Sequence, residues 1–104
     1  MGFPKALFEN NIEELSSFSR GLSLPVRISI LKILIEKRTW VNNEVFSNLP
    51  LTIVTRDRHL QALINLGLVE YIHQNGSMHY RINQPVFDKM IMEFNQLFVL
   101  NKTD

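Results

Sequence analysis

The chain lacks cysteine altogether, so disulfides, thiolate metal sites and cysteine redox sensing are excluded for its 104 residues. It also lacks any apolar run near the roughly 20 residues that a membrane-spanning helix needs. The N-terminal residues have neither the apolar core nor the small-residue cleavage site of a secretory signal. These absences lead us to expect a cytoplasmic protein.

An excess of charge of either sign is missing as well. Lys and Arg number 11 and Asp and Glu number 10, which gives a net charge of +1. Any affinity for nucleic acid must therefore come from where the charges lie. The chain also lacks a phosphate-cradling glycine loop, clustered carboxylates and a nucleophile with a matching base, so we predict no enzymatic activity.

The apolar residues that are present suffice for one small domain. The chain is 45% hydrophobic over 104 residues, enough for one modest core. Neither an internal repeat nor a linker divides it. We therefore expect a single domain over residues 1–104.

The segment over residues 58–83 has the most specific pattern. Leu60, Leu63 and Ile64 repeat at the spacing of one helix face, and a glycine follows where that helix should end. Two strand-like runs come next, joined by Asn75-Gly76, a dipeptide typical of a type I′ hairpin turn. A helix with a polar outer face backed by a hairpin is the arrangement of a winged helix-turn-helix. In that arrangement the helix enters the DNA major groove and the hairpin tip reaches the flanking backbone.

Two helices are predicted at the N-terminal side of this segment. The first covers about residues 5–18 and is broken by Gly21. The second begins with Ser23 as its N-cap and Pro25 in its first turn. Its apolar residues cover a wide arc, so we expect it to be the central core helix: Ile28, Ile30, Leu31, Leu34 and Ile35.

Three more helices complete the expected order. A short third helix starts at the cap Asn42, and a fourth starts at the cap Thr52, where Ile53 should extend the buried stripe. Asn83 caps the last helix after the hairpin, and residues 39–41 could add a short strand to the wing. The predicted fold is therefore mainly α with a small β-hairpin wing, with four helices before the hairpin and a fifth after it.

At this point the residues resemble a known family, the ArsR-type winged-helix transcriptional repressors. The resemblance lies in LSLPVRISILKIL and TRDRHLQALINLGLVEYIHQNGSMHYRI and covers about residues 15–100. Its specific parts are Ser23-x-Pro25-x-Arg27, Arg58-His59-Leu60, Gly67-Leu68-Val69 and Tyr80-x-Ile82. The resemblance implies a homodimer held by the first and last helices that binds an inverted-repeat operator. It also implies derepression by a ligand, commonly a metal.

The sequence departs from the metal-sensing members of that family. They carry a cysteine motif on the third helix, whereas WVNNEVFSN here has no thiol. Others use aspartate and histidine on the last helix, but residues 84–101 contain no histidine. We therefore predict no metal or other cofactor, and the residues single out no effector. On the DNA side, Arg56 replaces a usually apolar residue, and Asp57 replaces a usual serine or threonine.

The predicted DNA contacts come from the fourth helix and the wing. Arg58 and Arg56 could neutralise phosphates or bond guanine, and the alternative is that they are solvated surface arginines. Smaller polar groups on the helix and the wing could add contacts. The full predicted set is Thr55, Arg56, Arg58, His59, Asn75, Ser77 and Arg81.

The hairpin register argues against a metal site in the wing. With Asn75-Gly76 as a two-residue turn, His73 pairs with Met78 and Ile72 pairs with His79. Strand side chains alternate, so the two histidines point to opposite faces and cannot chelate one ion within a monomer. The same register places Tyr71 opposite Tyr80 and Val69 opposite Ile82 as a buried face, and Glu70 opposite Arg81 as a surface charge pair.

The last helix suggests a protein partner. Its apolar stripe is too wide to be covered by one domain, so we predict a homodimer built with the first helix. Two other readings remain open: a monomer that packs this helix wholly inside, and a ligand pocket lined by Phe and Met. The predicted dimer residues are Phe8, Ile12, Leu15, Phe87, Met90, Ile91, Phe94, Leu97 and Phe98.

Together these features predict a homodimeric winged-helix regulator that binds double-stranded DNA, in the form of a transcriptional repressor. The alternative is a winged-helix module for protein–protein interaction that does not bind DNA. The small net charge and Asp57 support that alternative.

Overall fold

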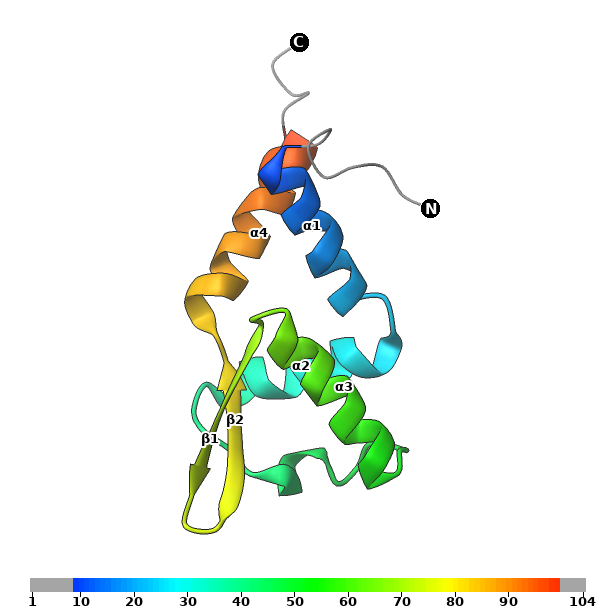
Figure 1. Cartoon of the computed structure of the whole chain (residues 1–104), viewed down its shortest axis with the longest axis vertical. Helices are drawn as coiled ribbons and strands as arrows, with labels where there is room; N and C mark the ends of the chain where they lie inside the picture. The colour runs from blue at the N-terminus through cyan, green and yellow to red at the C-terminus, as the bar shows by residue number, and fades with distance from the viewer. Residues whose placement is uncertain (1–8, 100–104) are drawn as a thin grey trace.

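A computed structural model describes residues 9–99 and shows a mainly helical fold with a hairpin wing (Figure 1). The elements follow one another along the chain as α1 (Asn10–Gly21), α2 (Pro25–Lys37), the 3-10 helix η2 (Asn43–Phe46), α3 (Ile53–Asn65), β1 (Val69–Gln74), β2 (Ser77–Ile82) and α4 (Gln84–Val99). The winged-helix arrangement is the expected one. The expected five helices are not: residues 9–99 contain four α-helices.

The missing helix is the predicted third one, which is a single turn of 3-10 helix. Asn42 caps it as expected, because its side chain accepts a hydrogen bond from the Glu44 backbone N–H at 3.0 Å. The chain turns away directly after Phe46, and this one turn buries only the Phe46 ring, which is 2% exposed. Val, Phe, Asn and Ser are weak helix formers, so without a longer buried face nothing extends the turn into an α-helix.

The boundaries of α1 and α2 also differ from the prediction. Glu9 is extended, so α1 begins at Asn10, and it continues through Gly21 rather than stopping at residue 18. Gly21 is buried, and a Cβ there would lie 2.7 Å from Leu66 Cδ1, so the glycine serves a close approach of α1 to the end of α3. Residues 5–8 of the predicted helix lie outside the described residues.

The predicted cap of α2 at Ser23 is wrong, although Pro25 does occupy its first turn. The Ser23 hydroxyl instead donates to the Arg20 carbonyl at 2.8 Å, and Leu24 stands at the cap without a side-chain bond. Ser23 is therefore used to close the end of α1 rather than to open α2.

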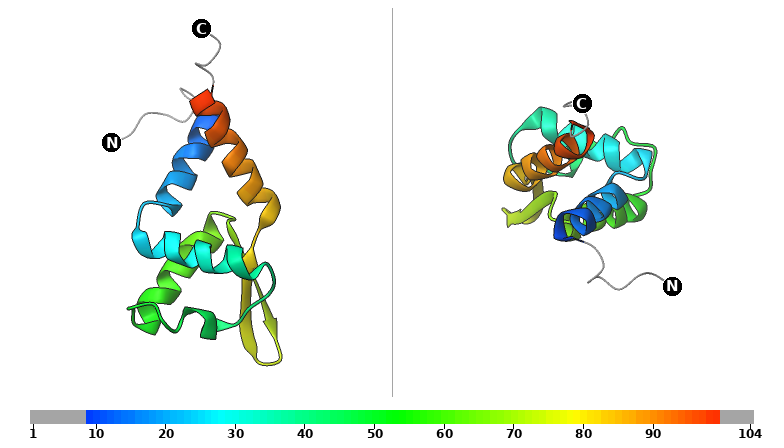
Figure 2. Two further views of the ribbon diagram at one scale, coloured as in Figure 1. Left: turned by 180° about the vertical axis from the view of Figure 1, so that it is seen from behind. Right: turned by 90° about the horizontal axis from the view of Figure 1, so that it is seen from above.

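The molecule has two ends, as Figures 1 and 2 show. At one end α1 and α4 converge, and the Lys89 ammonium on α4 lies 3.0 Å from a Glu14 oxygen on α1. At the other end lie the N-terminal end of α3, η2 and the tip of the wing. In between, α2 and α3 pack against each other, with α2 behind α3 in Figure 1 and in front of it in the reversed view.

A single core joins these elements. It draws on every element and is closed at the α4 end by Met90, which is 4% exposed. Its fully buried side chains are Phe46, Ile30, Leu34, Leu60, Leu63 and Leu68. Three apolar residues expected in the core lie outside it, because α2 and α3 each bury one face only: Ile28 (51% exposed), Ile35 (39%) and Ile53 (66%).

The hairpin matches the predicted register. Val69 pairs with Ile82, Tyr71 with Tyr80, and His73 with Met78. The turn residues Asn75 and Gly76 have φ of 53° and 80°, as a type I′ turn requires.

The face predicted to be buried is covered only near the base of the wing. Val69, Tyr80 and Ile82 are buried, but Tyr71 is 49% exposed. Residues 39–41 add a single antiparallel bridge, with Val41 and Tyr80 exchanging backbone bonds at 3.0 and 2.8 Å. This bridge lies on the side of β2, so β1 is the outer strand of the wing.

Candidate nucleic-acid interface

The first turn of α3 is fixed by two threonines. The Thr52 hydroxyl accepts a hydrogen bond from the Thr55 backbone N–H at 3.2 Å and donates one to the Thr55 hydroxyl at 3.0 Å. The predicted cap at Thr52 is confirmed, and it satisfies a backbone donor that a helix start leaves free. Thr55 itself is half-buried, with its hydroxyl already bonded to the cap.

Arg56 lies mostly inside the domain. Its side chain is 13% exposed, and its guanidinium donates to one Asp57 oxygen from Nε at 3.1 Å and from Nη2 at 3.0 Å. The pKa of the Tyr80 hydroxyl is raised, mainly by burial and further by the Asp57 charge, and the Arg56 charge opposes part of this rise. The charge of Arg56 is therefore shared with Asp57.

Arg58 differs from Arg56 in its exposure and in its partners. Its side chain is exposed, and within residues 9–99 its guanidinium forms no hydrogen bond or ion pair. Leu60 and Leu63, which are buried, define the inner face of the same helix. Arg58 is therefore a cation on α3 whose donors are free for an incoming anion or base edge.

His59 is tied to the rest of the domain by a contact that the sequence did not reveal. Its Nδ1 accepts a hydrogen bond from Arg27 Nε on α2 at 3.2 Å, and Arg27 Nη1 donates to the Arg20 carbonyl on α1 at 3.0 Å. Because Nδ1 accepts, the imidazole proton resides on Nε2. The motifs around Arg27 and His59 that carry the family resemblance therefore meet in space, 32 residues apart.

The electrostatics keep His59 uncharged. Burial, followed by the charges of Arg27 and Arg58, lowers the pKa of His59. Protonation would place a donor opposite the Arg27 guanidinium and would break their hydrogen bond. The neutral ring therefore positions α3 against α2 and leaves its Nε2–H as a possible donor.

The wing supplies the second part of the site. Asn75 and Ser77 are exposed at its tip, which lies at the same end of the molecule as the start of α3 (Figure 1). The Ser77 hydroxyl is held by the Gln74 carbonyl at 3.4 Å. The structure therefore brings two predicted contacts of the wing and the predicted contacts of α3 to one end of the domain.

Arg81 lies away from that tip, near the base of the wing. Its Nε is 2.7 Å from a Glu70 oxygen, which confirms the predicted pair, and its guanidinium carbon lies 4.3 Å from the centre of the Trp40 ring. Both contacts hold the guanidinium against the wing. Trp40, which the sequence left without a role, is therefore a support for Arg81.

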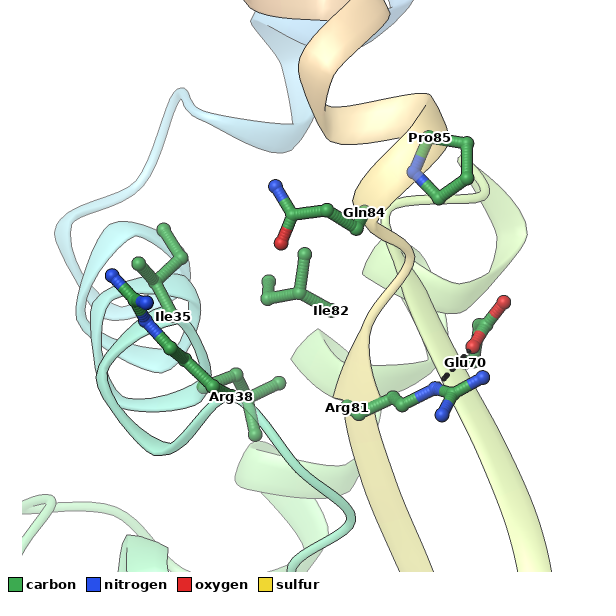
Figure 3. A pocket seen from close by; sticks show the side chains of 8 residues that line it. Ile35, Arg38, Glu70, Arg81, Ile82, Gln84 and Pro85 are labelled. Atoms are coloured by element: carbon green, nitrogen blue, oxygen red, sulfur yellow. Dashed lines mark hydrogen bonds and ion pairs between the residues drawn. The ribbon is translucent and has the colours of Figure 1, made fainter.

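Arg81 also borders a groove between α2, β2 and the start of α4 (Figure 3). The groove has a volume of about 560 Å³, and Arg38 at the end of α2 and Gln84 at the start of α4 are among the residues that line it. Gln84 Nε2 donates to Asp88 at 2.8 Å, and Arg81 bonds Glu70, so two of the polar groups on its rim are already paired. Residues of α2, the wing and the start of α4 line the groove.

The predicted dimer residues divide into two sets. Leu15 and Met90 are buried, and Phe87 and Phe94 pack against the core. The rest of the set is in water: Ile12 (49% exposed), Ile91 (42%), Leu97 (49%) and Phe98 (72%), while Phe8 lies outside the described residues. Ile91 and Phe98 lie seven residues apart and so share one side of α4. We refer to these four exposed residues as the α1–α4 surface.

Two structural observations bear on other classes of function. Within residues 9–99, no three His, Asp or Glu side chains come together in a way that could hold a metal ion. The helices of the same residues include none that is long and apolar enough to cross a membrane.

The arrangement of α3 and its wing defines a winged helix-turn-helix protein. No family model and no curated protein matches the chain. Among solved structures, an ArsR-like transcriptional regulator from Rhodococcus sp. RHA1 is similar at 25% identity and a TM-score of 0.70, covering 88% of this chain and 85% of that one.

Two further structures are similar over 88% of this chain. A second ArsR family transcriptional regulator has 17% identity and a TM-score of 0.74, with 94% of its chain covered. HlyU from Vibrio cholerae has 20% identity and a TM-score of 0.68, with 98% covered. The chain therefore has the ArsR-type winged-helix fold, as the sequence resemblance predicted.

Proposed function

We propose that the protein is a transcriptional regulator that binds double-stranded DNA, and that it acts as a homodimeric repressor at an inverted-repeat operator. The observation that carries this proposal is an ArsR-type winged helix whose α3 presents an exposed, unpaired Arg58. Two of the similar structures are themselves described as transcriptional regulators. The proposed role is regulatory rather than catalytic, is carried by one domain over residues 1–104, and belongs in the cytoplasm.

In this proposal α3 enters the major groove with its first turns. Arg58 bonds a base edge or a phosphate, and Thr55 and His59 lie beside it as smaller polar contacts. Arg56 contributes through a charge that it shares with Asp57.

The wing follows the flanking backbone. Asn75 at its tip donates an uncharged hydrogen bond to a phosphate oxygen, and Ser77 does so by exchanging its bond to the Gln74 carbonyl. Arg81 reaches a phosphate from the base of the wing by exchanging its bond to Glu70.

The proposed dimer is formed by the α1–α4 surface of each copy. Phe98 is 72% exposed and Leu97 is 49% exposed, and large apolar side chains of this kind are enriched at the buried centres of interfaces. A two-fold axis through this surface would place the two α3 helices in successive major grooves, about 34–36 Å apart. That spacing is the reason to expect an inverted repeat.

The test begins with a duplex selected by the protein from random sequences, with affinity measured by fluorescence anisotropy. Arg58→Ala should weaken binding by about 1–3 kcal/mol. A base contact would also relax the sequence preference at one position in each half-site, whereas a phosphate contact would lower the salt slope by about one unit. Lys32→Ala is the matched control, because it removes an exposed cation from α2, on the other side of the domain from α3 (Figure 2).

The competing candidate is an interaction module that does not bind DNA. The near-neutral charge and the exposed α1–α4 surface favour it. It would replace our proposal if the protein selects no duplex and shows no DNA affinity at low salt. It would also be favoured if Arg56→Ala, Arg58→Ala and Arg81→Ala together left the affinity for a selected duplex unchanged.

A further inference from the structure

The first turn of α3 exposes two aliphatic side chains that no contact of the fold explains. Ile53 is 66% exposed and Val54 is 68% exposed, the highest values among the exposed aliphatic residues of the described chain. Elsewhere on α3, Leu60 and Leu63 are buried. The helix therefore has apolar residues on its inner face and, separately, an apolar pair at its leading end.

The residues next to Ile53 and Val54 are polar, and most of them already form hydrogen bonds or ion pairs within the protein. Thr52 and Thr55 bond each other, and Arg56 is held by Asp57. Arg58, one turn further on, keeps its donors free. A small apolar pair bordered by threonines and an arginine differs from the α1–α4 surface, which has four residues and includes the aromatic ring of Phe98.

We propose, on the basis of the DNA-binding function proposed above, that Ile53 and Val54 form a binding site for the C5-methyl groups of thymine. The thymine methyl is the apolar group that a base pair presents in the major groove. Ile53 and Val54 are continuous with the proposed DNA surface, because they occupy the helix turn that leads α3 into the groove. Arg58, one turn further along the same helix, supplies a positive charge that attracts the DNA backbone.

The side-chain type suits this role. Isoleucine and valine are branched at Cβ, and in a helix such side chains occupy one χ1 rotamer almost exclusively. Their methyl groups are therefore held in fixed positions before DNA arrives, and little conformational entropy is lost on contact. Neither side chain can donate or accept a hydrogen bond, so they distinguish bases by shape and methyl contact alone.

The experiment uses the full chain and its selected duplex. Each thymine of one half-site, with its symmetric mate, is replaced in turn by deoxyuridine, which removes the methyl and keeps every hydrogen-bonding group. We expect one or two positions in each half-site at which affinity falls by about fourfold per methyl lost, the effect of returning one buried carbon to water. At those positions 5-methylcytosine should restore part of the affinity lost when cytosine replaces thymine.

A pair of variants assigns the effect to these residues. Ile53→Ala combined with Val54→Ala should bind the thymine duplex more weakly and should no longer distinguish thymine from deoxyuridine. Ile28→Ala is the matched control, since it truncates an aliphatic residue of α2 that is 51% exposed, and it should keep the distinction. Unchanged thermal unfolding of the double variant shows that the loss does not come from misfolding.

The outcomes separate this inference from the function on which it rests. Selective DNA binding that is insensitive to deoxyuridine, or a sensitivity that survives in the Ile53/Val54 double variant, would overturn the methyl site and leave the regulator intact. If the protein has no DNA affinity at low salt but the double variant loses affinity for another protein, both proposals fail together.

Discussion

Both ends of the molecule expose apolar side chains to water, but the residues that surround these side chains differ. At the α3 end Ile53 and Val54 stand among threonines and arginines, at the leading turn of one helix. At the α1–α4 end four exposed apolar residues come from two converging helices, and the Lys89–Glu14 pair, with Glu93 beside it, joins these helices.

The difference indicates two kinds of partner. A few methyl groups beside one free cation, Arg58, suit a charged surface with small apolar spots, such as the DNA major groove. A larger apolar surface that includes an aromatic ring suits burial against protein. Exposure alone would have assigned both ends the same role, and the neighbouring charges separate them.

The largest effect is expected from substitutions at the α1–α4 end. Ile91→Glu combined with Phe98→Glu should split the proposed dimer, because it forces charges into its apolar centre. Hot-spot residues at the centre of an interface contribute about 2 kcal/mol or more each, so the dissociation constant of the dimer should rise by about 1,000-fold or more. Light scattering at micromolar concentration should change from twice the chain mass to the chain mass.

The control for that experiment is Gln96→Glu, which adds a charge to an exposed polar position of α4 on the side away from Ile91 and Phe98. It should leave the dimer intact. A monomer mass for the unmodified chain would remove the proposed dimer altogether, and with it the contrast between the two ends.

Within the α3 end, two arginines should respond differently to removal. Arg56→Ala should destabilise the fold by about 1–2 kcal/mol, because the side chain is 13% exposed and its loss leaves Asp57 without a partner. Arg58→Ala should change the free energy of unfolding by less than about 0.5 kcal/mol while weakening DNA binding. Urea unfolding measures the first quantity, and equal destabilisation by both variants would contradict the difference in their burial.

The smallest expected effect is a pH dependence at His59. The pKa of His59 is lowered in the fold, so the unfolded chain takes up its proton first as the pH falls. Stability from this group is therefore fully present above its unfolded pKa of about 6.5 and declines below it, levelling off once the folded pKa is passed.

Urea unfolding between pH 5 and pH 8 measures how the free energy of unfolding changes with pH. This range extends about one unit or more to each side of the unfolded pKa of His59. His59→Gln should flatten this slope, because the amide oxygen can still accept from Arg27 and does not titrate in this range. A slope that His59→Gln leaves unchanged would assign the pH dependence to other groups.

The parts that the sequence predicted correctly depend on neighbours in the chain. Asn75-Gly76 determines a hairpin turn by its φ angles alone, and the register of the strands follows from that turn. The Thr52 cap likewise needs only the backbone three residues ahead.

The parts that failed depend on how many faces of a helix find a partner. Ile28 and Ile53 look like core residues by periodicity, yet α2 and α3 each bury one face and leave these side chains in water. The third helix failed for the same reason, because a segment with only Phe46 to bury stops after one turn. The candidate site was affected too, although here the signal was present: Arg56 lies four residues before Leu60 and seven before Leu63, on the buried face, whereas Arg58 lies opposite.

The sequence by itself thus determined the class of fold, the hairpin and its register, and the helix that could face DNA, because capping, turn geometry and side-chain alternation are local. Only the tertiary structure decided which apolar residues stay exposed. It also joined His59 to Arg27 across 32 residues. These outcomes depend on the packing of α3 against α2 and the wing, and contacts between segments distant in the chain leave no local pattern in the sequence.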